Sequence, residues 1–179
     1  SYTEVVAAPE YADGTVEILA GRKNLRILKV PRMDRLEEYV VHPYVDIRSL
    51  MDGGMVLQRS YQTRIVSAED FIPAEAVHDG TTYRCSRQPT QEELEDLLFG
   101  WRVESGITSN SVLYVKNGTT VGIGTGEQDR VGVAKIARDK AEDRNPGSIE
   151  GAVMISDGFF PFRDGVDIGL KAGVTAVAQ

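Results

Sequence analysis

Short apolar runs recur along the chain and are separated by glycine, proline and polar residues. Near the start, the run "EVVAA" (4–8) is followed by "TVEILAG" (15–21), a short helical pattern with Gly21 as its stop signal. The segment "LRILKV" (25–30) then alternates apolar and polar side chains and ends at Pro31. The first 30 residues therefore predict a β-α-β unit.

The next part of the sequence is less regular. "YVDIRSL" and "MVLQRS" predict extended segments on either side of the break Gly53-Gly54, whereas residues 59–80 are mostly polar with isolated apolar positions. The segment "TTYRCS" (81–86) predicts another strand.

The clearest helix begins at Thr90, because Thr90 and Glu93 form a capping-box pattern. Gly106 is its expected end. Apolar side chains recur with helical spacing on one face, at Leu94, Leu97, Leu98 and Trp101.

Asn117-Gly118 is the strongest hairpin signal, since both residues tolerate a positive φ and apolar runs flank them. Further segments follow with the spacing of alternating strands and helices. They are a helix over 130–140, a polar linker over 141–148, a strand over 151–156, a helix over 164–173 and a last strand over 174–178.

This alternation places the fold in the α/β class, with a mixed β-sheet flanked by helices on both faces. The two β-α-β units, one near each end of the chain, suggest two related lobes, residues 1–87 and 88–179. The chain opens almost on an apolar run and stops on "AGVTAVAQ", from which we expect a piece of a longer protein.

The composition excludes several classes of partner and site. The formal charge is −7, from 27 acidic and 20 basic side chains, which argues against a nucleic acid or an anionic membrane as partner. The single Cys85 excludes an internal disulfide, and with His42 and His78 leaves too few ligands for a structural zinc site. From this cysteine usage we expect a cytoplasmic protein. No apolar run approaches the roughly 20 residues of a membrane helix.

Three alternating glycines, Gly122, Gly124 and Gly126, lead from a strand toward Arg130. Such a turn presents backbone N–H groups to an anion, and the arginine fork suits phosphate or carboxylate. The spacing matches neither the dinucleotide fingerprint nor a phosphate loop. The other interpretation is a tight connection in which a side chain would collide with the sheet, with Arg130 in a surface ion pair.

A second unusual stretch, "SDGFFPFRDGVD" (156–167), gathers aromatic residues at a strand-to-helix junction. Phe159, Phe160 and Phe162 around Pro161 predict either a loop that plugs the core or a wall for a flat heterocycle.

Asn110 stands at the entry to a buried strand, where its amide could contact a ligand's donor and acceptor together; a turn or cap is the other interpretation. Glu4 lies on or beside the first strand and is expected to face solvent. Neither histidine is assigned a catalytic role.

At these stretches the chain resembles 5-aminoimidazole-4-carboxamide ribonucleotide (AICAR) formyltransferase, an enzyme family of late purine biosynthesis. The resemblance spans nearly the whole chain in the family's order. The matching segments are "EVVAAPEY", "RKNLRILKV", "DIRSLMDGGMVLQ", "TSNSVLYVKNGTTVGIGTGEQDRV" and "SDGFFPFRDGVD".

The resemblance implies two cytidine-deaminase-like lobes without zinc, which agrees with the missing H-x-E and P-C-x-x-C motifs. It implies AICAR and the cosubstrate N10-formyltetrahydrofolate as ligands, and a homodimer. Asn110 matches the asparagine at the carboxamide and the reacting formyl group, and is the implied catalytic residue. The implied substrate-binding residues are Glu4 (near the ribose hydroxyls), Gly124, Gly126, Arg130, Phe159, Phe160, Pro161 and Asp164.

The sequence also departs from the family's pattern. Gly158 stands where alanine is usual, and Thr108 and Thr125 replace a lysine or glutamine and an alanine. Glu127 and Asp129 replace a glutamine and a serine, which shifts the glycine loop toward negative charge.

The family's Lys-His pair, to which proton transfer at the amine is attributed, has no counterpart here, nor does the nucleotide-contacting arginine expected after "AVAQ". Loss of a positioned acid–base group costs about 10² to 10⁴ in rate. The chain is therefore expected to be nearly inactive alone. Two other readings are a non-catalytic nucleotide- or folate-binding module and a purely structural lobe.

Overall fold

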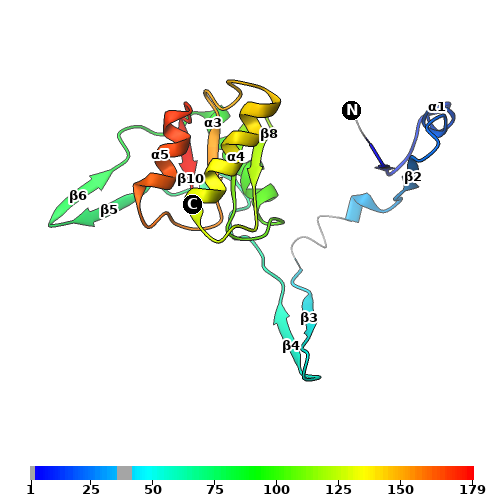
Figure 1. Cartoon of the computed structure of the whole chain (residues 1–179), viewed down its shortest axis with the longest axis horizontal. Coiled ribbons are helices and arrows are strands. Elements are labelled where there is room, and N and C mark those ends of the chain that lie inside the picture. Colours follow the sequence, from blue (N-terminus) through cyan, green and yellow to red (C-terminus); the bar gives the residue numbers. More distant parts are fainter. Residues whose placement is uncertain (1–2, 36–41) are drawn as a thin grey trace. The chain divides into compact units, whose positions relative to one another are not determined.

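A computed structural model describes residues 3–35 and 42–179 of the chain. The chain divides into two compact units, Ser1–Gln62 and Thr63–Gln179, which are described separately (Figure 1). The lobe boundary predicted between residues 87 and 88 stays a prediction.

The first unit contains the β-α-β unit predicted from the sequence. Strands β1 (Val5–Ala8) and β2 (Arg26–Lys29) pair in parallel and are connected through α1 (Thr15–Ala20). The Tyr11 hydroxyl donates to the Leu28 carbonyl at 2.9 Å and also lies 3.1 Å from the carbonyl of Val6, so it ties the two strands together. A short 3₁₀ helix follows, η1 (Met33–Arg35).

The segments expected around Gly53-Gly54 form an antiparallel hairpin, β3 (Val45–Ser49) and β4 (Met55–Arg59). Its register places four large apolar side chains on one face, and all four are exposed within the described residues: Val45, Ile47, Met55 and Leu57.

The second unit begins with η2 (Ala68–Asp70) and a hairpin of β5 (Glu75–His78) and β6 (Thr81–Arg84). The strand β6 was predicted, but the interpretation of residues 59–80 as irregular is wrong for β5. Every residue of both strands is exposed, so no apolar alternation marks them. The turn signal was Asp79-Gly80, where both residues have positive φ (48° and 74°).

The rest of the second unit is built on a four-stranded sheet in the order β10-β9-β7-β8. The sequence predicted a mixed sheet but not this order of strands. β10 pairs in parallel with β9, while β7 is antiparallel to both β9 and β8. The strands are β7 (Val112–Lys116), β8 (Thr119–Gly124), β9 (Val153–Ser156) and β10 (Ala176–Ala178).

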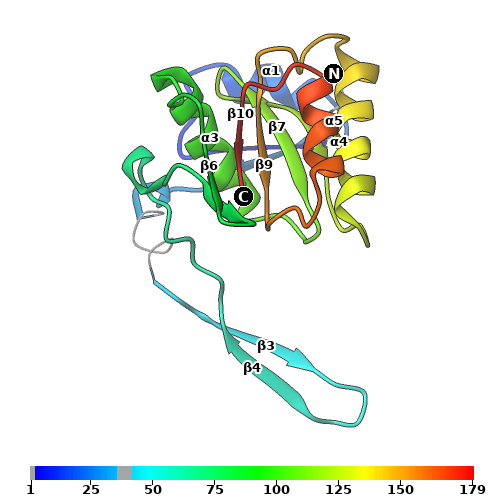
Figure 2. The same ribbon diagram turned by 90° about the vertical axis from the view of Figure 1, so that its left-hand side faces the viewer.

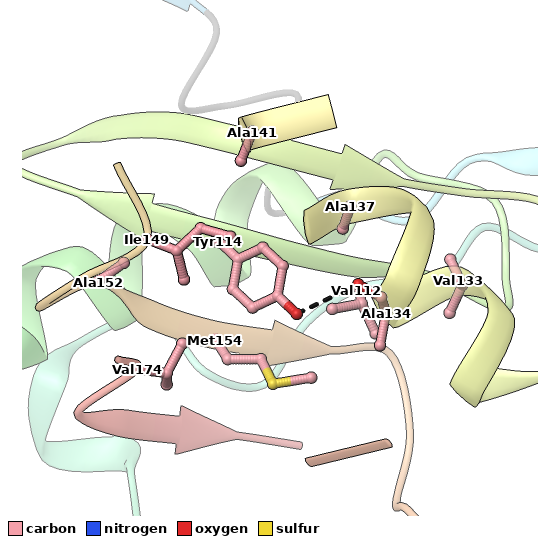
Figure 3. Packing of buried hydrophobic residues seen from close by; sticks show 10 residues of the cluster. All are labelled: Val112, Tyr114, Val133, Ala134, Ala137, Ala141, Ile149, Ala152, Met154 and Val174. Carbon is pink, nitrogen blue, oxygen red and sulfur yellow. Dashed lines mark hydrogen bonds between the residues drawn. The ribbon is translucent and has the colours of Figure 1, made fainter. Parts of the chain in front are cut away.

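Helices cover both faces of this sheet, which confirms the α/β class. Figure 2 shows α3 (Gln91–Glu104) on one side of the strands, and α4 (Arg130–Arg144) and α5 (Arg163–Lys171) on the other. Successive side chains of β7 point to opposite faces, so Leu113 packs under α3 whereas Tyr114 packs under α4. The Tyr114 hydroxyl donates to the Ala134 carbonyl at 3.2 Å (Figure 3).

Helix α3 starts with the predicted capping box, in which Thr90 and Glu93 bond each other's backbone N–H groups. It also supports the predicted hairpin turn. The buried Asp96 carboxylate accepts the N–H groups of Asn117 at 2.8 Å and Gly118 at 2.6 Å.

The polar linker predicted over 141–148 begins too early. Helix α4 continues through Arg144, because the fully buried Ala141 still packs in the core while the charged residues after it remain outside. The chain leaves the helix only at Asn145, before Pro146.

Candidate functional site

The candidate site lies at one edge of the four-stranded sheet. Val112, the first residue of β7, is in register with both Gly124 at the end of β8 and Ser156 at the end of β9. The segments that enter β7 and leave β8 and β9 therefore meet at this edge. Backbone hydrogen bonds between Asn110 and Glu127 hold two of them together.

A pocket of about 340 Å³ opens here. Six of the nine site residues implied by the resemblance line it, although they come from three separate segments. Its lining consists of Asn110, Gln128, Asp129, Arg130, Val131, Phe159, Phe160, Pro161, Phe162 and Asp164.

Asn110 is half-buried at the pocket wall. Its side-chain Nδ2 donates to the Glu127 carbonyl at 2.8 Å, which orients the amide. Its Oδ1 accepts no hydrogen bond from the described residues. The amide thus has both a structural contact and an acceptor that a ligand could use.

The alternating glycines serve packing as well as the turn. A Cβ atom on Gly124 would lie 2.4 Å from the Val133 carbonyl oxygen, so this residue lets α4 approach β8 closely. The collision expected in the packing interpretation is thus with the helix rather than with the sheet. Gly126 differs, because it has a φ of +71° and open space around its Cβ position. Neither glycine lines the pocket, and their ligand-binding roles stay predictions.

One of the loop's two added carboxylates, that of Asp129, has a structural role. Asp129 caps α4, with its Oδ1 accepting the Gly132 N–H at 2.6 Å, so its charge is held at a helix N-terminus. The two threonines that depart from the family pattern contact each other: the Thr125 hydroxyl donates to the Thr108 carbonyl at 2.8 Å.

Arg130, the first residue of α4, lies at the pocket with its side chain only 20% exposed. Its Nη1 donates to Asp157 Oδ1 at 2.6 Å and to Ser156 Oγ at 3.1 Å. This is a half-buried ion pair and not the exposed surface pair that one interpretation predicted.

The Asp157 carboxylate accepts two further hydrogen bonds beside the one from Arg130. The Ser111 backbone N–H donates to Oδ1 at 2.9 Å, and the Ser109 hydroxyl donates to Oδ2. Burial acts to raise the pKa of this carboxyl, but the hydrogen bonds from Ser109, Arg130 and Ser111 outweigh it and hold the pKa below its ordinary value. Asp157 is therefore a fixed anion behind the pocket.

Sequence reasoning missed Asp157 as a functional residue, along with a second carboxyl nearby. Glu104, at the end of α3, is 5% exposed and accepts the Ser111 hydroxyl through Oε1. Burial raises its pKa, opposed by the Ser111 hydrogen bond. The signal for Asp157 was its place directly after a buried strand.

The aromatic loop combines both predicted roles. Phe160 is half-buried, packs against the core beneath α4 and is accommodated by Gly165, whose Cβ position lies 2.6 Å from the Phe160 ring. Phe159 and Phe162 are instead 71% and 74% exposed at the pocket. One ring therefore anchors the loop, and the other two supply exposed aromatic surface.

Two further residues implied by the resemblance, Asp164 and Glu4, lie in different units of the chain. Asp164 lines the pocket and its Oδ1 accepts the Gly165 N–H at 2.9 Å. Glu4 lies in the first unit, where its carbonyl accepts the Arg26 N–H at 2.9 Å. Its role near a ribose stays a prediction.

Across residues 3–35 and 42–179, no group of three or more histidine, cysteine or acidic side chains is placed to hold a metal ion. A separate search of the same ranges finds no helix with the length and apolar character needed to cross a membrane.

Comparisons with known proteins agree with the resemblance. The bifunctional purine biosynthesis protein PurH of Buchnera aphidicola is 34% identical over 178 residues, and that of Xanthomonas euvesicatoria is 37% identical. Each alignment covers 99% of this chain but only 31% and 30% of the relative, so the chain spans about a third of the length of these curated relatives. The family model described as AICARFT/IMPCHase bienzyme matches residues 1–140. The chain therefore belongs to the AICARFT/IMPCHase bienzyme family.

Proposed function

We propose that this chain supplies a nucleotide- and folate-binding surface for AICAR formyltransferase chemistry in purine biosynthesis. The reaction moves the formyl group of N10-formyltetrahydrofolate to the 5-amino group of AICAR. The observation that carries the proposal is the pocket itself, which gathers Asn110, Arg130 and the aromatic loop from segments far apart in the sequence.

The lining residues suit these ligands. Exposed rings of Phe159 and Phe162 offer apolar surface to a flat heterocycle. Arg130 has N–H groups beyond Nη1 that donate to no described residue, and these can bind an anionic or carbonyl oxygen. The Asn110 amide can orient the carboxamide or the formyl group, which is the basis for assigning it the catalytic role.

The transfer also requires removal of a proton from the attacking amine and stabilisation of the formyl oxygen. No lysine or histidine is among the residues that line the described pocket. We therefore propose that the chain alone transfers formyl groups at a rate about 10² to 10⁴ times lower than that of an enzyme with a positioned acid–base group.

The proposal includes a cytoplasmic homodimer built from cytidine-deaminase-like lobes, with no nucleic acid or membrane partner. The exposed apolar face of the β3–β4 hairpin supports the dimer, because such a face is normally covered in a working protein.

Titration separates the possible roles. The 179-residue chain is titrated with AICAR and, separately, with a folate analogue, and binding is measured by isothermal titration calorimetry. Saturable binding of AICAR that is weakened by Arg130→Ala supports the proposal. A folded chain that binds neither ligand at millimolar concentration excludes a binding role and leaves the structural lobe.

Catalysis is tested in a chimera. The matching segment of the Xanthomonas euvesicatoria protein is replaced by this chain, and formyl transfer is assayed. Activity in the chimera that exceeds activity of the chain alone is expected. A folded chimera that binds both ligands but transfers nothing contradicts the catalytic part of the proposal and retains the binding part.

A further inference from the structure

Arg130 is oriented by groups that lie outside the pocket lining. Asp157 and Ser156 both accept hydrogen bonds from the same guanidinium nitrogen, Nη1, at 2.6 and 3.1 Å. Neither acceptor lines the pocket. The contacts therefore fix the arginine from behind and leave its other nitrogens without a described partner.

The carboxylate that holds Arg130 is itself held on both oxygens. Oδ1 also accepts the backbone N–H of Ser111, and Oδ2 accepts the hydroxyl of Ser109. Asp157 is 18% exposed, so its position is set by these contacts and not by solvent. A fixed anion of this kind restricts the rotamers of the flexible arginine side chain.

Gly158 completes the arrangement. A Cβ atom at this residue would lie 2.6 Å from Arg130 Nη2 and 3.2 Å from Cζ. The absence of a side chain at Gly158 therefore gives the guanidinium the volume it occupies. The Ser156 hydroxyl, which accepts from Arg130, donates in turn to the Gly158 carbonyl at 2.9 Å.

We propose that Asp157 is a positioning residue that fixes the guanidinium of Arg130, so that its remaining N–H groups are preorganised for an anionic or carbonyl oxygen of the nucleotide. Asp157 acts through Arg130 and does not touch the ligand. This inference rests on the proposed function for the identity of the ligand, but not for the arrangement of the two side chains.

The direct test observes Arg130 in the 179-residue chain by NMR of its guanidinium nitrogens. We expect restricted guanidinium rotation that is lost in Asp157→Asn, which keeps the shape of the side chain and removes its charge. Asp167→Asn is the matched control, because Asp167 pairs with the exposed Arg163 and is not part of the pocket lining. Unchanged Arg130 signals in Asp157→Asn would overturn the inference.

The second test is a double-mutant cycle on AICAR affinity. Asp157→Asn is expected to weaken binding by about tenfold to a hundredfold, as misplacement of a binding group does. In an Arg130→Ala background it should change affinity by less than about twofold, because the two residues act as one unit. An equal loss in both backgrounds means that Asp157 acts independently of Arg130, which contradicts the proposal.

Two controls keep the results interpretable. If Asp157→Asn does not fold, Ser109→Ala removes one hydrogen bond from the carboxylate and should loosen Arg130 to a smaller extent; unchanged Arg130 signals in that variant count against the inference. If the unsubstituted chain binds no AICAR, the proposed function fails, and the Arg130 signals alone still decide whether Asp157 positions it.

Discussion

The carbonyl oxygen of Ala137 in α4 lies 2.2 Å from the position that a Cβ atom on Gly122 in β8 would occupy. Gly124 stands in the same relation to Val133, one helical turn earlier, at 2.4 Å. These two glycines allow α4 to lie directly on β8, and this contact places Arg130, at the start of α4, beside the end of the strand.

Gly122→Ala is expected to destabilise the second unit by about 1 to 3 kcal/mol, because the added methyl group must displace backbone. Denaturant unfolding measures the change. Gly106→Ala is the matched control, since its Cβ would meet its nearest neighbour at an ordinary 3.6 Å. Equal stability of the two variants would show that α4 does not pack on β8 as described.

Asp96→Ala is expected to lower the free energy of unfolding by about 2 kcal/mol, because two backbone N–H groups of the Asn117-Gly118 turn lose a charged acceptor. Glu95→Ala, one residue earlier and exposed, should change it by less than about 0.5 kcal/mol. A small effect at both positions would mean that the turn holds without Asp96.

Acid should weaken the start of α3. The hydrogen bond from Arg87, together with the Thr90 cap, lowers the pKa of Glu93 to about 2 from the ordinary 4.5. Since the folded pKa is depressed, the stabilisation is present above about pH 4.5 and is lost as the pH falls toward 2. Arg87 is half exposed, so solvent screening limits the contribution to about 1 kcal/mol.

The measurement is unfolding by urea at several pH values across this window, in the chain and in Arg87→Ala. The variant should lose most of the Glu93 contribution to the pH dependence. Arg84→Ala, which breaks the exposed pair with Glu75, should keep it. A pH dependence unaffected by Arg87→Ala contradicts the assignment to Glu93.

Asn110→Ala is expected to reduce AICAR affinity about tenfold while lowering stability by only about 1 kcal/mol, the value of the one side-chain hydrogen bond that Asn110 donates to Glu127. Paired titration and thermal unfolding measure the two effects. Asn145→Ala, at the other end of α4, should leave affinity unchanged. If Asn110→Ala only unfolds the chain, the turn interpretation of Asn110 is correct.

Local signals in the sequence predicted the parts of the fold that depend on neighbouring residues. The capping box at Thr90 and the turn at Asn117-Gly118 involve residues at most three apart, and both are confirmed. The exposed strand β5 left no apolar pattern, and the last turn of α4 depends on burial of Ala141 against a distant strand, so neither could be derived locally.

The site shows the same division. The glycine loop, Asn110 and the aromatic loop are each marked by a local residue pattern in the sequence. The structure brings most of them to one pocket. The link between Arg130 and Asp157 spans 27 positions and depends on strand order, which the sequence does not reveal. A packing role for Gly122 and Gly124 was one of the two interpretations of the sequence, but their contact with α4 depends on the same long-range arrangement.

The most direct test of the central claim is a crystal structure of the chain with AICAR at saturating concentration. The account predicts the nucleotide in the pocket at the sheet edge, with Arg130 and Asn110 in hydrogen-bond contact and an exposed phenylalanine of the aromatic loop against the heterocycle. Nucleotide bound at another surface, with this pocket closed by its own side chains, would contradict it.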